Sequence, residues 1–195
     1  MYKYKIYNNI AKEGLDILNQ NMQEDQVNPD TLLLRSQVLQ ESDFNSSLKC
    51  VGRAGAGTNN IPIAEATNKG VVVFNTPGAN ANAVKELVVC GMLLSSRGIL
   101  QGSSFAMTLK GLDGANLNAS MESEKKNFKG SELKVKTLGI VGLGAIGSLL
   151  AQTANIMGMK IIGYDPYISV DAAWRLPKEV EKADTLEALL SNSDY

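Results

Sequence analysis

The 195-residue sequence contains no histidine, only two cysteines and few aromatic residues. Without histidine, and with Cys50 and Cys90 far apart in the chain, the usual ligand set of a zinc site is missing, and the cysteines do not make a disulfide framework. Both cysteines lie in apolar runs, so the sequence predicts that they are buried thiols. The lack of histidine also removes the commonest general base near neutral pH.

An excess of charge of one sign is also missing, because 19 basic residues are balanced by 20 acidic ones. This balance gives no basic surface for nucleic acid or for an anionic membrane. The longest apolar stretch, residues 87–94, is too short to span a bilayer, and the first residues lack the core of a signal peptide. The hydrophobic share of 44% is that of an ordinary globular protein, and we expect it in the cytoplasm.

Glycine, in contrast, is abundant, and the chain is organised around the glycine-rich stretch 138–147. Residues 137–141 are apolar and predict a strand that is covered on both faces. Gly142 and Gly144 allow a tight turn that brings backbone amides close to a diphosphate, and Gly147 lets the next helix pack close to the strand. Helical spacing of apolar residues starts at Ile146 and ends near Gly158.

A second strand, residues 160–164, follows that helix and ends at Asp165. The spacing is that of an acidic residue that accepts hydrogen bonds from the adenosine ribose, and a carboxylate there favours NAD over NADP by repelling a 2′-phosphate. A glycine pattern alone also serves plain packing of a strand on a helix. The glycines, the helix, the second strand and the aspartate together predict a dinucleotide-binding site.

The first half of the chain alternates predicted strands with predicted helices, which indicates a parallel sheet. The strands are residues 2–7, 31–34, 48–51 and 70–74, and the helices are residues 10–18, 63–68 and 81–97. Ligands of such sheets gather at the carboxyl ends of the strands. The residues expected at that rim are Arg35, Ser36, Arg53, the Gly-Ala-Gly turn at 55–57, and Asn80.

Guanidinium groups and exposed backbone amides select anions, and two separate arginines favour a phosphate or a ligand with two anionic groups. An arginine after a strand can also be no more than part of a surface ion pair. Residues 98–130 are polar and weakly periodic and are interpreted as a linker or arm. We therefore expect one domain at 1–97 and a second at 98–195, which has only two strands of a sheet that normally has about six.

Several of these stretches resemble the D-isomer-specific 2-hydroxyacid dehydrogenases. The stretches are Leu34-Arg35-Ser36, residues 52–60, residues 75–82, residues 142–147 and Tyr164-Asp165-Pro166. The resemblance implies a flavodoxin-like substrate domain followed by the first part of a Rossmann NAD-binding domain. It also implies that Arg35, Ser36, Arg53, Gly55 and Asn80 bind substrate, while Ala56, Gly142, Gly144, Ala145, Ile146, Gly147 and Asp165 bind NAD.

The activity implied by the resemblance is NAD-dependent oxidation of 3-phosphoglycerate to 3-phosphohydroxypyruvate in serine synthesis. Relatives pair as homodimers through the cofactor domain and its arm, and Lys125 or Lys126 would reach the partner's site. The family's catalytic arginine, glutamate and histidine match no position here, so the sequence is expected to be an inactive N-terminal part. Two alternatives stay open: a dehydrogenase of glycerate or lactate type, and a short protein that binds a nucleotide or anion without catalysis.

Overall fold

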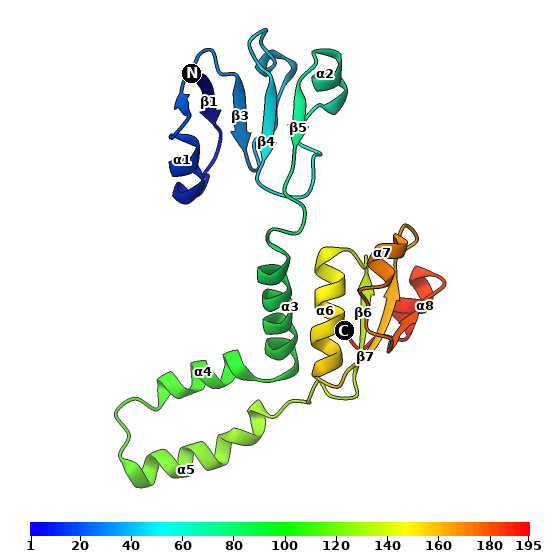
Figure 1. Ribbon diagram of the computed structural model, residues 1–195. Coiled ribbons are helices and arrows are strands. Elements are labelled where there is room, and N and C mark those ends of the chain that lie inside the picture. The colour runs from blue at the N-terminus through cyan, green and yellow to red at the C-terminus, as the bar shows by residue number, and fades with distance from the viewer. The chain divides into compact units, whose positions relative to one another are not determined.

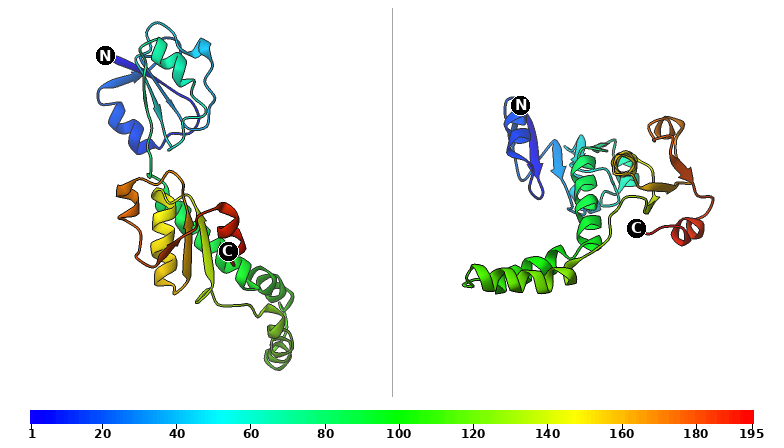
Figure 2. Two further views of the ribbon diagram at one scale, coloured as in Figure 1. Left: turned by 90° about the vertical axis from the view of Figure 1, so that its right-hand side faces the viewer. Right: turned by 90° about the horizontal axis from the view of Figure 1, so that it is seen from below.

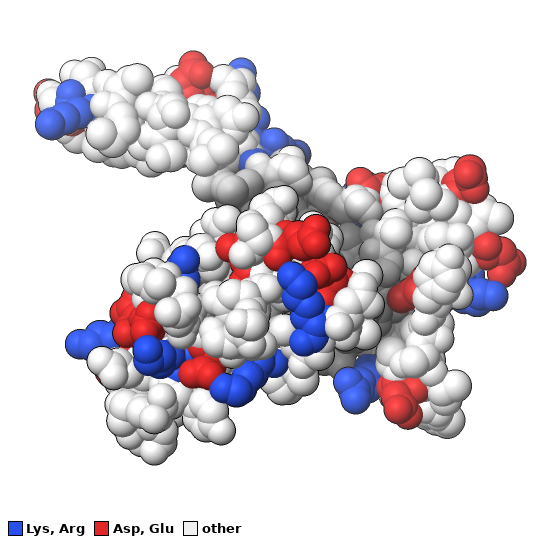
Figure 3. Space-filling model, turned by 90° about the horizontal axis from the view of Figure 1, so that it is seen from above, with Lys and Arg blue, Asp and Glu red and all other residues white.

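The computed structural model describes all 195 residues, which form two compact units, Met1–Asn80 and Ala81–Tyr195. Each unit has a parallel sheet with helices, so the predicted α/β class is confirmed (Figure 1). Acidic and basic side chains are interspersed on the face shown in Figure 3, in line with the balanced composition. None of the helices combines the length and the apolar character needed to cross a membrane.

The first unit has a five-stranded sheet in the order β2-β1-β3-β4-β5, with all neighbours parallel. This is the flavodoxin-like order, as predicted. Its strands are β1 (Tyr2–Ile6), β2 (Met22–Glu24), β3 (Thr31–Leu34), β4 (Cys50–Arg53) and β5 (Val72–Phe74), and its helices are α1 (Lys12–Leu18), η1 (Glu41–Asp43) and α2 (Ile63–Asn68). Strand β2 was not predicted, because three residues with one apolar side chain give no pattern.

The core of this unit lies on one face of the sheet. Leu32, Leu34 and Val51 are buried there, together with Phe44 and Leu48 from the loops. Alternation along the strands turns Thr31, Leu33, Cys50 and Gly52 to the other face, where they are half-buried. Cys50 is therefore only partly covered, and Cys90 in the second unit is exposed, so the prediction of two buried thiols was wrong.

The second unit begins with α3 (Ala81–Ser96), which packs against α6 (Ala145–Ile156) (Figures 1 and 2). Met92 of α3 enters the same core as Leu150, Ala151 and Ala154 of α6. The compact units consequently divide before α3, whereas the sequence predicted a boundary after residue 97. Helical periodicity alone does not tell which neighbour a helix packs against.

The sheet of this unit has three strands in the order β6-β7-β8, not the two predicted. They are β6 (Thr137–Val141), β7 (Lys160–Tyr164) and β8 (Val180–Lys182), and the short helices are α7 (Val170–Ala173) and α8 (Leu186–Ser191). Tyr195 also bonds to the free edge of β6: its N–H donates to the Thr137 carbonyl at 3.2 Å, and its carbonyl accepts from Gly139 at 2.9 Å. That pattern is a parallel strand pair.

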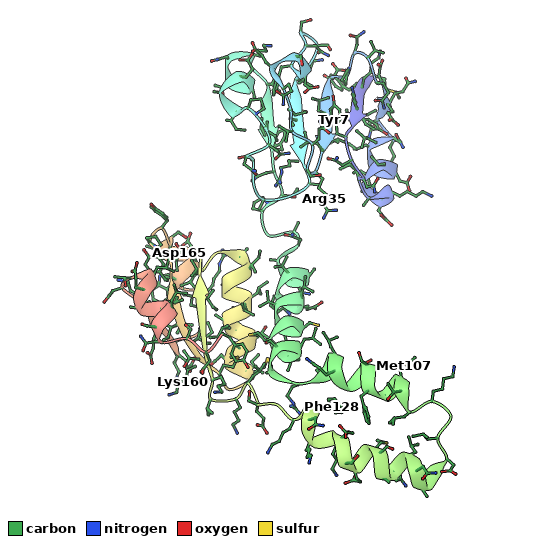
Figure 4. The ribbon with its side chains drawn as sticks, turned by 180° about the vertical axis from the view of Figure 1, so that it is seen from behind. Tyr7, Arg35, Met107, Phe128, Lys160 and Asp165 are labelled. Carbon is green, nitrogen blue, oxygen red and sulfur yellow. The ribbon has the colours of Figure 1, made fainter.

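Residues 98–130, predicted as a polar arm, are mostly helical: α4 (Ile99–Thr108), α5 (Gly114–Glu124) and η2 (Lys125–Phe128). The arm is closed at its base, where Gly98 donates to the Phe128 carbonyl at 3.3 Å and Ser131 donates to the Ser96 carbonyl at 3.0 Å. Phe128, which is labelled in Figure 4, packs against Phe105 of α4, with ring centroids 5.3 Å apart. No residue of the three helices is buried.

Candidate functional site

The carboxyl ends of the strands in the first unit border a hollow of about 380 Å³. It brings together three of the predicted substrate residues, Arg35, Gly55 and Asn80, with Asn9, Ile10, Ala11, Gly14, Ala54, Thr76 and Ala79. Arg53 lines an adjoining apolar hollow of about 210 Å³, which shares Ile10, Gly14, Ala54 and Thr76 with the first. Ser36 and Ala56, also predicted here, line neither hollow.

The two arginines at this rim have no partner for their charge. Arg35 follows β3, and its side chain extends from the carboxyl end of the sheet (Figure 4). Its guanidinium makes no hydrogen bond or ion pair with the protein. Arg53 is half-buried at the end of β4, and its Nε atom is buried without an acceptor. A buried donor without an acceptor is unfavourable, so Arg53 is suited to take an anionic ligand, and the exposed, unpaired guanidinium of Arg35 is free to bind one as well. The alternative of a surface ion pair does not apply to either arginine.

Gly55 serves the site in a way that the sequence did not indicate. Its N–H was expected to face a ligand, but it donates to the Thr76 Oγ1 atom at 2.8 Å. Its φ of +149° and the room it leaves explain the glycine: a Cβ atom there would lie 2.6 Å from the Arg53 Nη1 atom. Gly55 thus makes space for the Arg53 guanidinium.

Two asparagines that the sequence analysis passed over hold the Arg35 loop. The Asn8 Oδ1 atom accepts from the N–H groups of Arg35, Ser36 and Gln37, at 3.3, 3.0 and 2.8 Å. The Asn60 Nδ2 atom donates to the Gln37 carbonyl at 2.6 Å and to the Arg35 carbonyl at 3.4 Å. The position of Asn8 just after β1, at the same rim, was the signal that could have pointed to it.

The glycine-rich turn of the second unit has the geometry expected of a diphosphate cradle. Gly142 has a φ of +87°, and a Cβ atom at Gly147 would lie 2.1 Å from the Gly142 carbonyl oxygen, so both positions require glycine. Gly144 is the N-cap of α6 and supplies no side chain to cap it. The first amides of α6, at Ala145 and Ile146, therefore have no protein acceptor and are suited to bind an anion.

Asp165, at the end of β7, lies beside this turn (Figure 4). Its Oδ2 atom accepts from the Leu143 N–H at 2.8 Å, and its Oδ1 atom accepts from the Tyr167 N–H at 3.0 Å. The carboxylate is half-buried and has further acceptor capacity for a ribose hydroxyl. The residues predicted to bind NAD in this unit are thus gathered at one end of its sheet, around the amino end of α6.

Known proteins match this sequence over most of its length. Residues 102–195 match the family model of the D-isomer specific 2-hydroxyacid dehydrogenase NAD binding domain. D-3-phosphoglycerate dehydrogenase of Methanocaldococcus jannaschii is 38% identical over 169 residues, which is 85% of this chain and 30% of that protein. Hydroxypyruvate reductase of Thermotoga maritima is 37% identical over 183 residues, 90% of this chain and 55% of that protein.

The chain belongs to the D-isomer-specific 2-hydroxyacid dehydrogenase family.

A solved structure of this family, the NAD⁺-bound 3-phosphoglycerate dehydrogenase of Entamoeba histolytica, aligns with a TM-score of 0.67 at 26% identity. The alignment covers 98% of this chain and 60% of that one. The glycine-rich turn and Asp165 therefore lie in an NAD-binding domain of this dehydrogenase family. The chain spans about a third of the length of the D-3-phosphoglycerate dehydrogenase relative and just over half of the hydroxypyruvate reductase.

Proposed function

We propose that these residues hold 3-phosphoglycerate and NAD in an enzyme that oxidises 3-phosphoglycerate to 3-phosphohydroxypyruvate for serine synthesis. The observation that carries the proposal is the pair of arginines at the rim of the first unit that have no carboxylate partner. A phosphorylated 2-hydroxyacid has two anionic groups for two guanidinium groups. The D-3-phosphoglycerate dehydrogenase relatives support the same substrate.

Each site residue has a task in this reaction. Arg35 and Arg53 bind the phosphate and carboxylate groups and orient the hydroxyl-bearing carbon, with Ser36 and Asn80 as further polar groups of the rim. Gly142, Gly144, Ala145, Ile146 and Gly147 would hold the pyrophosphate through backbone amides, Asp165 would accept from the ribose, and Ala56 would contact the nicotinamide. Bound there, NAD would supply the hydride acceptor that the oxidation of the substrate needs.

Proton transfer needs a base, and none of the residues that line the two hollows is a histidine, a carboxylate or a lysine. Oxidation of an alcohol requires a base for the hydroxyl proton, and the chain has no histidine. Arg35 and Arg53 are cations that bind anions but do not accept protons. The 195-residue chain therefore binds its ligands without turnover, and steady formation of NADH from 3-phosphoglycerate by the purified chain would contradict this.

Isothermal titration of the chain with 3-phosphoglycerate tests the proposed substrate. Arg35→Ala and Arg53→Ala should each weaken binding about tenfold to a hundredfold, because each removes a charge-assisted pair. Arg175→Ala is the matched control, since Arg175 lies in the second unit and also forms no ion pair. Unchanged affinity in both rim variants would refute the proposal.

A second candidate is a dehydrogenase for unphosphorylated 2-hydroxyacids, which the hydroxypyruvate reductase relative supports. The same titration with D-glycerate separates the two. If the arginines bind phosphate, 3-phosphoglycerate should bind at least about tenfold more tightly than glycerate. Equal affinity for the two would favour the second candidate, and binding of NAD alone would favour a nucleotide-binding protein without catalysis.

We also infer that the chain pairs with a second copy through the arm. The arm helices bury no residue, yet they carry exposed apolar side chains, among them Leu100, Met107 and Met121, which are 62%, 74% and 49% exposed. Such a surface is typical of an interface. Sedimentation should show a dimer, and Leu100→Glu should shift it towards the monomer. Lys125 and Lys126 follow α5, where they would face the partner.

A further inference from the structure

The loop that carries Arg35 has nearly all of its backbone groups bound by two asparagine side chains. Three successive N–H groups, of Arg35, Ser36 and Gln37, converge on the Asn8 Oδ1 atom at 3.3, 3.0 and 2.8 Å. On the carbonyl side, Asn60 donates to Gln37 at 2.6 Å and to Arg35 at 3.4 Å. Amides that converge in this way form a concavity for one acceptor atom.

Both asparagines are themselves fixed. Asn60 is only 7% exposed, and its own carbonyl accepts from the Leu39 N–H at 3.0 Å. Asn8 directly follows Tyr7, whose N–H donates to the Leu33 carbonyl at 2.7 Å and so extends the pairing of β1 with β3. Asn8 has a φ of +67°, a conformation in which asparagine is the most favoured residue after glycine. The two asparagines that hold residues 35–37 are therefore themselves held by the sheet and its loops.

The consequence falls on the Arg35 guanidinium, which has no partner in the protein. With the backbone of residues 35–37 held from both sides, the Arg35 guanidinium is the free polar group that reaches the 380 Å³ hollow. A loop without these bonds would have to order itself when an anion binds, and that ordering would weaken binding.

We propose that Asn8 is a positioning residue that fixes Arg35 for the anionic ligand, with Asn60 as its counterpart on the carbonyl side. The proposal rests on the proposed function, because it takes Arg35 to be a ligand of 3-phosphoglycerate. Asn8 acts through Arg35 and not through a contact of its own, since its side-chain oxygen is occupied by the three loop amides.

The test is a double-mutant cycle on the 195-residue chain, with 3-phosphoglycerate titrated by NMR so that weak binding stays measurable. Asn8→Gly keeps the backbone conformation and removes the acceptor, and it should weaken binding about tenfold. In an Arg35→Ala background the same change should have no further effect, because the residue that Asn8 positions is gone. Additive effects of the two changes would overturn the proposal.

Asn45→Ala is the matched control for a general loss of stability. The Asn45 Oδ1 atom also accepts from successive backbone amides, of Ser47 and Leu48, both at 3.0 Å, but it does not line the hollow. Asn45→Ala should lower the melting temperature as Asn8→Gly does, but it should leave the affinity for 3-phosphoglycerate unchanged. Equal loss of affinity in both variants would overturn the proposal.

The design separates this inference from the proposed function. If the unsubstituted chain does not bind 3-phosphoglycerate, both the proposed function and this inference fail. If it binds, and Arg35→Ala weakens binding while Asn8→Gly does not, the proposed function stands and the positioning role alone is refuted.

Discussion

The Oδ2 atom of Asp165 accepts a hydrogen bond from the Leu143 N–H at 2.8 Å. The residue that ends the second strand of the NAD-binding domain therefore holds the middle of the glycine-rich turn, besides being placed for the ribose. If Asp165 binds the ribose as proposed, a single carboxylate links the shape of the turn to the choice of dinucleotide.

This double role predicts a graded response to substitution of Asp165. Asp165→Asn keeps an acceptor for Leu143 but removes the negative charge, so NAD affinity should fall about tenfold and NADP should be discriminated less. Asp165→Ala removes the acceptor as well and should lower the melting temperature in addition. Calorimetry with both dinucleotides measures the effect, and Asp171→Asn is the control on the exposed helix α7. Equal stability of the two variants would contradict the structural part of the role.

The two glycines at the start of α6 should respond differently to alanine. Gly147→Ala places a Cβ atom 2.1 Å from the Gly142 carbonyl, and it should destabilise the second unit by about 3 kcal/mol. A Cβ atom at Gly144 would meet nothing within 4 Å, so Gly144→Ala should keep the stability of the unsubstituted chain. It should bind NAD more weakly, because the methyl group would face the pyrophosphate in the proposed site. Thermal unfolding and NAD titration separate the two effects. Unchanged stability of the Gly147→Ala chain would contradict the close approach of Gly147 to the Gly142 carbonyl.

Substitution of two glycines in the first unit, Gly55 and Gly14, should change its stability in opposite directions. Gly55→Ala should destabilise it by about 1–3 kcal/mol, because φ of +149° is strained for any other residue and the methyl group would meet Arg53. Gly14 lies inside α1, and a Cβ atom there would have no neighbour within 4 Å, so Gly14→Ala should stabilise the unit by about 0.5–1 kcal/mol. Denaturant unfolding of the two variants should shift the midpoint in opposite directions.

Acid should weaken both units through aspartates whose pKa is lowered in the folded chain. The Lys49 ammonium and the Lys3 N–H lower the pKa of Asp30, and the Thr137 N–H and the Lys136 charge lower that of Asp194. Their stabilisation is fully present above the unfolded pKa of about 3.9 and is lost as pH falls through the lower folded pKa.

Asp30→Asn should therefore reduce the dependence of stability on pH below about 4 in the first unit only, and Asp194→Asn in the second unit only. The Lys3 and Lys49 pKa values are raised, so their contribution is present at neutral pH and is lost in strong alkali. The unfolding of each unit, followed by its own NMR signals from pH 2 to 7, measures the effect of each substitution. An unchanged acid response in the two variants would contradict the roles given to Asp30 and Asp194.

The positions of strands and helices could be predicted wherever the local spacing of apolar residues and glycines was distinct. The apolar run of β6 and the glycines after it predicted the strand, turn and helix, because those features depend on neighbouring residues alone. Where the pattern was weak, prediction failed: β2 and β8 are three residues each, and the helices α4 and α5 lack an apolar face that is buried.

The candidate site shows the same limit. Arg35, Arg53 and Asp165 were predicted because each follows a strand in a parallel sheet, and the order of elements alone sends those positions to one rim of each sheet. Their partners were not predictable. Asn8 and Asn60 lie 27 residues before and 25 residues after Arg35, and nothing local to the loop indicates that they hold it.

By itself, the sequence determined the α/β class, the NAD-binding turn and the family, since these depend on residue types at short spacings. Only the tertiary structure decided that α3 packs with α6, that the Gly55 N–H is taken by Thr76, and that Asn8 holds the Arg35 loop. Each of these rests on contacts between residues far apart in the chain, and such contacts form only when the strands have paired and brought their ends together.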